Sequence, residues 1–72
     1  MSFSDNIKAI RKKSFLTQEE FSKIIGVTLI TVNRWESGKT KPNLMAMKSI
    51  KNYCIANSIP YADLEKEWLG EK

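Results

Sequence analysis

Apolar residues recur three or four positions apart along almost the whole chain, which places them on one face of an α-helix. This spacing predicts five helices, over about residues 4–13, 18–25, 28–36, 44–56 and 60–69. No run of four or more residues alternates between apolar and polar in the manner of a strand. The pattern therefore predicts an all-α protein folded as a compact five-helix bundle.

Residues that favour helix ends stand near the predicted boundaries. Ser4 is a suitable N-cap for the first helix. Thr17 and Glu20 form a capping box, in which each side chain bonds the backbone N–H of the other residue. Gly26 tolerates the left-handed conformation that ends a helix, and Thr28 is an N-cap type at the start of the next one. The second and third helices are therefore short and joined by a tight turn.

The apolar face of each helix predicts the core. The residues expected to face inward after the first helix are Phe21, Ile24, Ile25, Val32, Trp35, Leu44, Met47, Ile50, Cys54, Tyr61, Leu64 and Trp68. Cys54 is expected to be a small buried apolar residue rather than a redox sensor. The chain has one cysteine and no histidine, so we expect no disulfide, no metal, no cofactor and no catalytic residue.

Length and composition limit the class of protein further. With 72 residues, of which 42% are hydrophobic and 28% charged, the chain is expected to form a single domain over residues 1–72. Its start lacks the basic and apolar regions of a signal peptide, and its longest apolar run is far below the ~18 residues that span a bilayer. Together with the single thiol, these features predict a cytoplasmic protein with no membrane partner.

The charge is distributed unevenly. Residues 1–52 carry ten Lys and Arg against four Asp and Glu, whereas residues 53–72 carry two against four. A basic face on a small domain favours an anionic partner, and nucleic acid more than a membrane. A solvated basic surface without a partner would have the same composition.

The region from about 17 to 37 has the layout of a helix-turn-helix, whose second helix enters a DNA major groove. The positions that this layout constrains carry suitable residues: inward Phe21 and Ile25, a small Ser22 at the helix crossing, Gly26 at the turn, Val27 between the helices, and Val32 and Trp35 beneath the second helix. Each match is weak alone, but together at fixed spacing they form a specific pattern.

Three stretches also carry a family resemblance: Thr-Gln-Glu-Glu-Phe at 17–21, Ile-Gly-Val-Thr at 25–28, and Trp-Glu-Ser-Gly-Lys-Thr-Lys-Pro-Asn at 35–43. They resemble the Cro/C1-type (XRE-family) helix-turn-helix regulators, and the resemblance extends from about Ile7 to Cys54. It implies a lambda-repressor-like five-helix fold with the helix-turn-helix at the second and third helices. It also implies binding to operator DNA, typically as a dimer.

The resemblance also implies which residues meet the DNA. They stand at the start of the second helix, along the recognition helix and in the loop after it: Gln18, Thr28, Leu29, Ile30, Thr31, Asn33, Arg34, Lys39, Thr40 and Lys41. Arg11 and Glu36 occupy positions that form a buried ion pair in relatives. Both residues lie where a charge would need a partner, which agrees with that implication.

Leu29 and Ile30 depart from the polar residues that many relatives carry at these positions. Aliphatic side chains cannot hydrogen-bond base edges, but they can pack on the methyl groups of thymine. We therefore expect a two-fold symmetric, A·T-containing operator, with Arg34 either bonding a guanine or clamping a phosphate.

The favoured function is sequence-specific binding of double-stranded DNA by a small transcriptional regulator, and in particular a repressor that occupies its operator. The alternative is a protein-interaction module or antitoxin-like subunit with DNA binding secondary. An exposed Leu29 and Ile30 would suit a protein partner equally well. No small-molecule ligand is expected.

The C-terminal segment is rich in apolar residues for its length: Ile55, Ile59, Tyr61, Leu64, Trp68 and Leu69. The helix at about 60–69 is therefore a candidate dimerisation element, and the alternative is that Trp68 covers the core of a monomer. A two-fold dimer would place its recognition helices about 34 Å apart, one turn of DNA.

Overall fold

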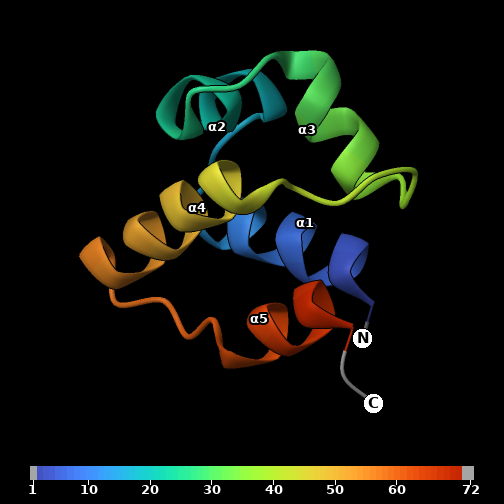
Figure 1. Cartoon of the computed structure of the whole chain (residues 1–72). Helices are drawn as coiled ribbons and strands as arrows, with labels where there is room; N and C mark the ends of the chain where they lie inside the picture. The colour runs from blue at the N-terminus through green and yellow to red at the C-terminus, as the bar shows by residue number, and fades with distance from the viewer. Residues whose placement is uncertain (1, 71–72) are drawn as a thin grey trace.

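The computed structural model describes residues 2–70, and within them the chain forms five helices and no strand. The helices are α1 (Phe3–Lys13), α2 (Gln18–Ile25), α3 (Leu29–Glu36), α4 (Leu44–Ala56) and α5 (Ala62–Leu69). Figure 1 shows α2 and α3 at one end of the molecule and α5 at the other, with α1 and α4 between them. The predicted all-α five-helix bundle is confirmed.

The local signals around the turn are confirmed. The Thr17 hydroxyl oxygen accepts the backbone N–H of Glu20 at 3.1 Å, and a Glu20 carboxylate oxygen accepts that of Thr17 at 2.9 Å. Gly26 ends α2 with φ of +88°, a conformation that a side chain would disfavour. Thr28 caps α3 by accepting the N–H of Thr31 at 3.2 Å. The sequence between 17 and 31 thus determines where both helices begin.

The start of α1 differs from the prediction. Ser2, rather than Ser4, is the N-cap, and its hydroxyl oxygen accepts the N–H of Asp5 at 3.2 Å. The helix begins one residue early because this places Phe3 on its inner face, where the side chain is buried. Ser4 then lies inside the first turn and shares a 2.9 Å hydrogen bond with the Ser2 hydroxyl.

The inner faces of all five helices meet in one core, made of Phe3, Ile7, Ile10, Phe21, Ile25, Val32, Trp35, Ala46, Met47, Ile50, Cys54 and Leu64. Two predicted core residues, Ile24 and Leu44, are instead exposed. Phe21, Ser22 and Ile25 define the buried side of the short α2, and Ile24 lies beside it. Leu44 is the first residue of α4, and Ala46 is buried in the first turn instead.

Helix α5 closes the core from the far end. Leu64 is buried, and Tyr61 and Trp68 pack partly buried against the core, as does Ile59 before the helix. The Asn6 amide donates to the Glu67 carboxylate, which joins the start of α1 to α5. The structure thus agrees with the alternative that Trp68 helps to cover the core of a monomer, while Leu69 stays exposed.

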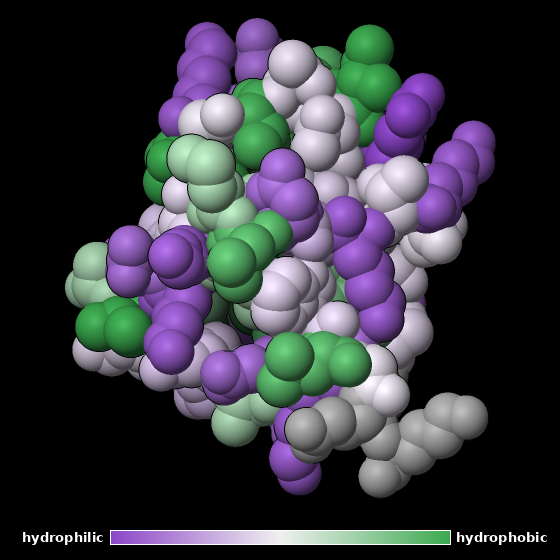
Figure 2. Space-filling model, viewed as in Figure 1, coloured by the Kyte–Doolittle hydropathy of each residue, from purple (hydrophilic) through white to green (hydrophobic). Residues whose placement is uncertain are grey.

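The surface carries several large apolar side chains: Phe15, Ile24, Leu29, Ile30, Leu44, Met45, Ile55 and Leu69. On the face shown in Figure 2, apolar side chains are separated by hydrophilic ones and do not form one continuous patch. Cys54 is fully buried as predicted, and burial raises the pKa of its thiol. Between residues 2 and 70, no helix is long and apolar enough to cross a membrane, and no group of three or more His, Cys, Asp and Glu is arranged to hold a metal.

Candidate nucleic-acid interface

Helix α3 is anchored from inside and offers its opposite side to solvent. Val32 and Trp35 are buried beneath it. Leu29 is 45% exposed, Ile30 is 67% exposed, and Arg34 is exposed one turn further along. The helix therefore presents two aliphatic side chains and one guanidinium to a partner, held on a rigid base.

The predicted ion pair between α1 and the end of α3 is confirmed. Arg11 Nε and Nη2 donate to the two carboxylate oxygens of Glu36 at 2.6 and 2.9 Å, and Arg11 Nη1 donates to the Leu16 carbonyl at 2.8 Å. Burial alone would raise the pKa of Glu36, but the hydrogen bonds from Arg11 and Gln18, together with the positive charges of Arg11 and Lys8, outweigh it and lower that pKa. The same pair raises the pKa of Arg11, chiefly through the Glu36 hydrogen bond. Both groups are therefore charged and fixed.

This pair extends to the predicted DNA-facing residue Gln18. The Gln18 amide N–H donates to Glu36 at 3.1 Å, and the Gln18 carbonyl oxygen accepts a long hydrogen bond from Asn33 at 3.5 Å. One chain of contacts thus joins α1, the first residue of α2 and the middle of α3. It holds the Gln18 amide in one orientation beside the exposed side of α3.

The loop after α3 separates its three predicted contact residues. The backbone N–H groups of Lys39 and Thr40 both donate to the Arg34 carbonyl, at 3.0 and 3.4 Å, and both side chains are exposed. Lys41 Nζ instead donates to the Glu67 carbonyl of α5 at 2.7 Å. A cation is favoured there because the last carbonyls of a helix carry partial negative charge. Lys41 would have to leave this carbonyl to contact a phosphate.

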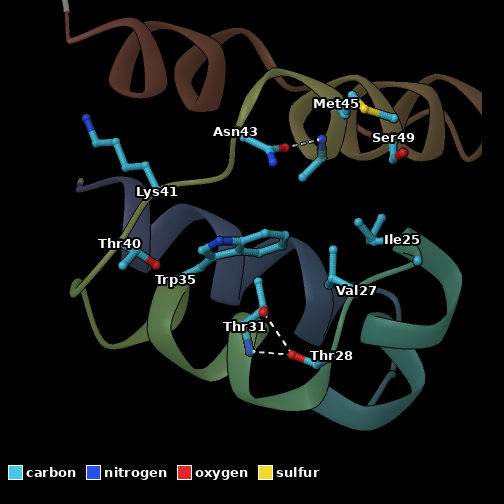
Figure 3. A pocket seen from close by; sticks show the side chains of 12 residues that line it. Ile25, Val27, Thr28, Thr31, Trp35, Thr40, Lys41, Asn43, Met45 and Ser49 are labelled. Atoms are coloured by element: carbon cyan, nitrogen blue, oxygen red, sulfur yellow. Dashed lines mark hydrogen bonds between the residues drawn. The ribbon is translucent and has the colours of Figure 1, made fainter.

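A groove of about 690 Å³ lies between α3 and the first half of α4. It is lined by four of the predicted residues, Thr28, Thr31, Thr40 and Lys41, with Trp35 between the two walls (Figure 3). The hydroxyls of Thr28 and Thr31 share a 2.8 Å hydrogen bond, which orients both. In Figure 3 the Lys41 side chain extends away from the groove, consistent with its bond to α5.

The opposite wall of the groove comes from residues that the sequence analysis missed. Asn43, Met45 and Ser49 line it from the start of α4. Met45 and Ser49 stand four positions apart, so they share the outer face of α4 directly after the loop. That spacing is the signal that could have identified them.

A second, more apolar groove of about 220 Å³ lies between α4 and α5 at the other end of the molecule. Leu44, Met47, Tyr61, Trp68 and Leu69 form most of its wall, with Lys48, Lys51 and Glu65 at its edges. The Lys51 ammonium lies 5.6 Å from the centre of the Tyr61 ring. This groove brings three residues of the predicted dimerisation segment, Tyr61, Trp68 and Leu69, together with Leu44.

Comparison with known proteins agrees with this geometry. A family model described as "Helix-turn-helix" matches residues 7–54. The chain is 32% identical over 53 residues to the "HTH-type transcriptional activator BcrR" of Enterococcus faecalis, covering 74% of this chain and 26% of that protein. It is 32% identical over 62 residues to the "Antitoxin PezA" of Streptococcus pneumoniae, covering 86% of this chain and 37% of that protein. The chain thus spans well under half the length of these relatives. No solved structure matches it significantly.

Proposed function

Since the chain belongs to the Cro/C1-type (XRE) helix-turn-helix family of DNA-binding transcription regulators, we propose that it binds a specific double-stranded DNA operator through α3 and represses transcription by occupying that operator. The observation that carries this proposal is the construction of α3. Val32 and Trp35 anchor the helix, while Leu29, Ile30 and Arg34 remain exposed on it. A helix built in this way can enter a major groove without losing its own support.

The exposed side chains suggest how bases are recognised. Leu29 and Ile30 pack on thymine methyl groups, and Arg34 donates two hydrogen bonds to a guanine or clamps a phosphate. An A·T-containing site therefore fits this helix best. The threonines at 28 and 31 and Asn33 flank these side chains and contact the edges of the same groove.

The phosphate contacts come from the two ends of the motif. Gln18 donates from the start of α2, where Glu36 and Asn33 hold its amide. Lys39 and Thr40 donate from the loop, and Lys41 joins them when it exchanges the Glu67 carbonyl for a phosphate. Contacts of this kind supply affinity that falls with salt but carries little sequence information.

The operator is two-fold symmetric because the protein binds it as a homodimer. The groove between α4 and α5 is the proposed contact, since the exposed Leu44 and Leu69 border it and a second copy would bury both. A two-fold axis at this end leaves α3 of each copy free to reach one half of the operator, about 34 Å from the other.

The experiment that tests the proposal is selection from a random pool of duplex DNA at near-physiological salt, followed by sequencing of the retained molecules. The expected result is a two-fold symmetric motif with thymines in each half. Arg34→Ala should lose the motif, whereas the matched control Lys12→Ala removes an exposed charge from α1 and should keep it. Retention without any motif, disappearing as salt rises, would contradict the proposal.

The second candidate function is that of a protein-binding subunit, such as an antitoxin. It is favoured by the adjacent exposed side chains of Leu29 and Ile30 and by the similarity to a protein named as an antitoxin. In that case, a protein partner would cover the exposed face of α3. Loss of partner binding in Leu29→Asp, with no DNA motif in the wild type, would support it.

A further inference from the structure

Two hydrogen bonds attach the C-terminal helix to the loop that follows α3. The indole N–H of Trp68 donates to the Pro42 carbonyl at 2.7 Å. Lys41 Nζ donates to the Glu67 carbonyl, also at 2.7 Å. Each bond joins residues 26 positions apart in the chain, so together they connect segments that are distant in sequence.

Trp68 faces two sites at once. Its ring lines the apolar groove between α4 and α5, together with Leu44 and Leu69. Its N–H donates to Pro42, at the end of the loop that carries Lys39 and Thr40. A movement of the ring therefore shifts the donor that holds Pro42.

The loop has few other attachments of its own. Lys39 and Thr40 share one acceptor, the Arg34 carbonyl in the last turn of α3. Pro42 has no N–H, so its carbonyl is the one backbone polar group through which it can be held by a hydrogen bond. Trp68 thus adds a side-chain hydrogen bond at the far end of this segment, where Asn43 caps α4, while Arg34 holds the near end.

We propose that Trp68 is a positioning residue that couples the α4–α5 groove to the DNA-facing loop. This proposal rests on the proposed function, which assigns dimerisation to the groove and DNA contact to the loop, and it adds an energetic link between the two sites. A second copy of the chain seated in the groove fixes the indole ring, and the indole N–H then holds Pro42, and with it Lys39 and Thr40, in place for phosphates. Because such coupling is reciprocal, DNA bound at the loop strengthens pairing at the groove.

The side chain must be a tryptophan to act in this way. Phenylalanine at this position would keep an aromatic ring in the groove but has no donor for Pro42. Trp68→Phe therefore separates the two actions. Tyr53→Phe is a matched control, since it also removes one polar hydrogen from a half-buried ring, which packs on Phe21 away from both sites.

Amide hydrogen exchange tests the positioning without DNA. In Trp68→Phe, the amides of Lys39 and Thr40 should exchange roughly three- to tenfold faster, the order of one lost neutral hydrogen bond. The amides of Gly26 and Val27, which donate to Ser22, should keep their wild-type rates. Equal acceleration at all four amides, or none, overturns the proposal, and Tyr53→Phe should change neither pair. Trp68→His, which retains a ring N–H, should restore part of the protection.

A duplex containing a single operator half-site tests the consequence for binding without bridging two copies. Trp68→Phe should weaken the affinity for half-site DNA roughly three- to tenfold. Lys41→Met should lower this affinity by a smaller factor in the Trp68→Phe variant than in the wild type. Half-site DNA should also tighten wild-type self-association, measured by sedimentation, but not that of Trp68→Phe. Self-association that is absent, or that the half-site leaves unchanged, overturns the coupling.

The wild-type protein offers a test that needs no variant. The indole N–H resonance of Trp68 should shift when half-site DNA is added, and an unchanged resonance overturns the proposal. Failure of the proposed function is a separate outcome: wild-type protein would then bind no duplex specifically, while the exchange result at Lys39 and Thr40 would still decide whether Trp68 positions the loop.

Discussion

The helix-turn-helix and the C-terminal helix are held by contacts of different range. In α2 and α3, Thr17 and Thr28 cap their helices by bonding N–H groups three residues away, and Gly26 turns the chain between them. In α5, no side chain caps the first turn, and its polar attachments come from Asn6, Lys41 and Pro42 in distant parts of the chain. The ends of α2 and α3 are thus set by local chemistry, with the Arg11–Glu36 pair added across the fold, whereas α5 is placed by distant contacts alone.

This difference predicts that α5 unfolds locally before α2 and α3 when a buried side chain of α5 is shortened. Leu64 is the buried residue of α5, and Leu64→Ala should cost about 3 kcal/mol of unfolding free energy because it leaves a cavity. Urea denaturation measures the loss, and hydrogen exchange should show α5 amides opening before those of α2 and α3. The exposed Leu69→Ala should stay within about 0.5 kcal/mol of the wild type. If the amides of α5 opened no earlier than those of α2 and α3, the proposed difference between the two regions would be wrong.

The stabilisation that the Arg11–Glu36 pair gives to the helix-turn-helix end of the molecule should depend on pH. Arg11→Met leaves Glu36 buried without its cation, so it should cost about 2–3 kcal/mol at pH 7, less than for fully buried pairs since the Arg11 side chain is 12% exposed. The lowered pKa of Glu36 means that the stabilisation is present above the unfolded-state pKa of about 4.3 and is lost as pH falls through the folded-state pKa. The difference between variant and wild type should therefore shrink below about pH 4.

Urea unfolding at several pH values between 7 and 3 measures this difference. Glu20 also has a lowered pKa, because its carboxylate accepts the Thr17 N–H, but its effect is common to both proteins and cancels. Lys12→Met is the control, since Lys12 is an exposed neighbour on the same helix. If the difference in unfolding free energy between Arg11→Met and the wild type stayed constant down to pH 3, the Arg11–Glu36 pair would not be its cause.

The capping box gives a smaller and more local effect. Thr17→Ala removes the acceptor for the Glu20 N–H and should cost about 1 kcal/mol, measured by thermal unfolding. Thr40→Ala, an exposed threonine outside any helix, should leave the stability unchanged. If Thr17→Ala were equally silent, tertiary packing rather than local capping would define α2.

The smallest expected change has the opposite sign. Phe15 has φ of +57° in the turn between α1 and α2, and its side chain is 95% exposed. Phe15→Gly relieves the left-handed strain at no loss of packing and should stabilise the protein by about 0.5–1 kcal/mol. Gly26→Ala, which adds a side chain at a similar φ, should destabilise it by a comparable amount. A lower melting temperature for Phe15→Gly would refute the strain argument.

The sequence predicted the features that depend on near neighbours. The boundaries of α2, α3 and α4 follow from caps and from Gly26, and the predicted core is correct at most positions. The Arg11–Glu36 pair was also anticipated, from the family resemblance and from the need of both charges for a partner. At α1, Ser2 and Ser4 are both good caps, and burial of Phe3 decided between them.

The sequence could not predict where long side chains bond across the fold. The prediction that Lys41 meets DNA gave no sign that its ammonium also bonds the Glu67 carbonyl of α5. Nothing within a few residues of Lys41 or Trp68 indicates these partners, since the contacts arise only when α5 packs beside the loop. Met45 was missed for a similar reason, because it lines a groove that exists only between two helices.

The aliphatic pair on α3 also has a thermodynamic consequence. Side chains such as Leu29 and Ile30 lose hydrating water when they enter a groove, and this makes the heat capacity change of binding more negative. Near room temperature such a term is mostly entropic, so its share of the affinity strengthens on moderate warming. Calorimetry at several temperatures would therefore distinguish a recognition helix of this kind from one that reads bases with amides.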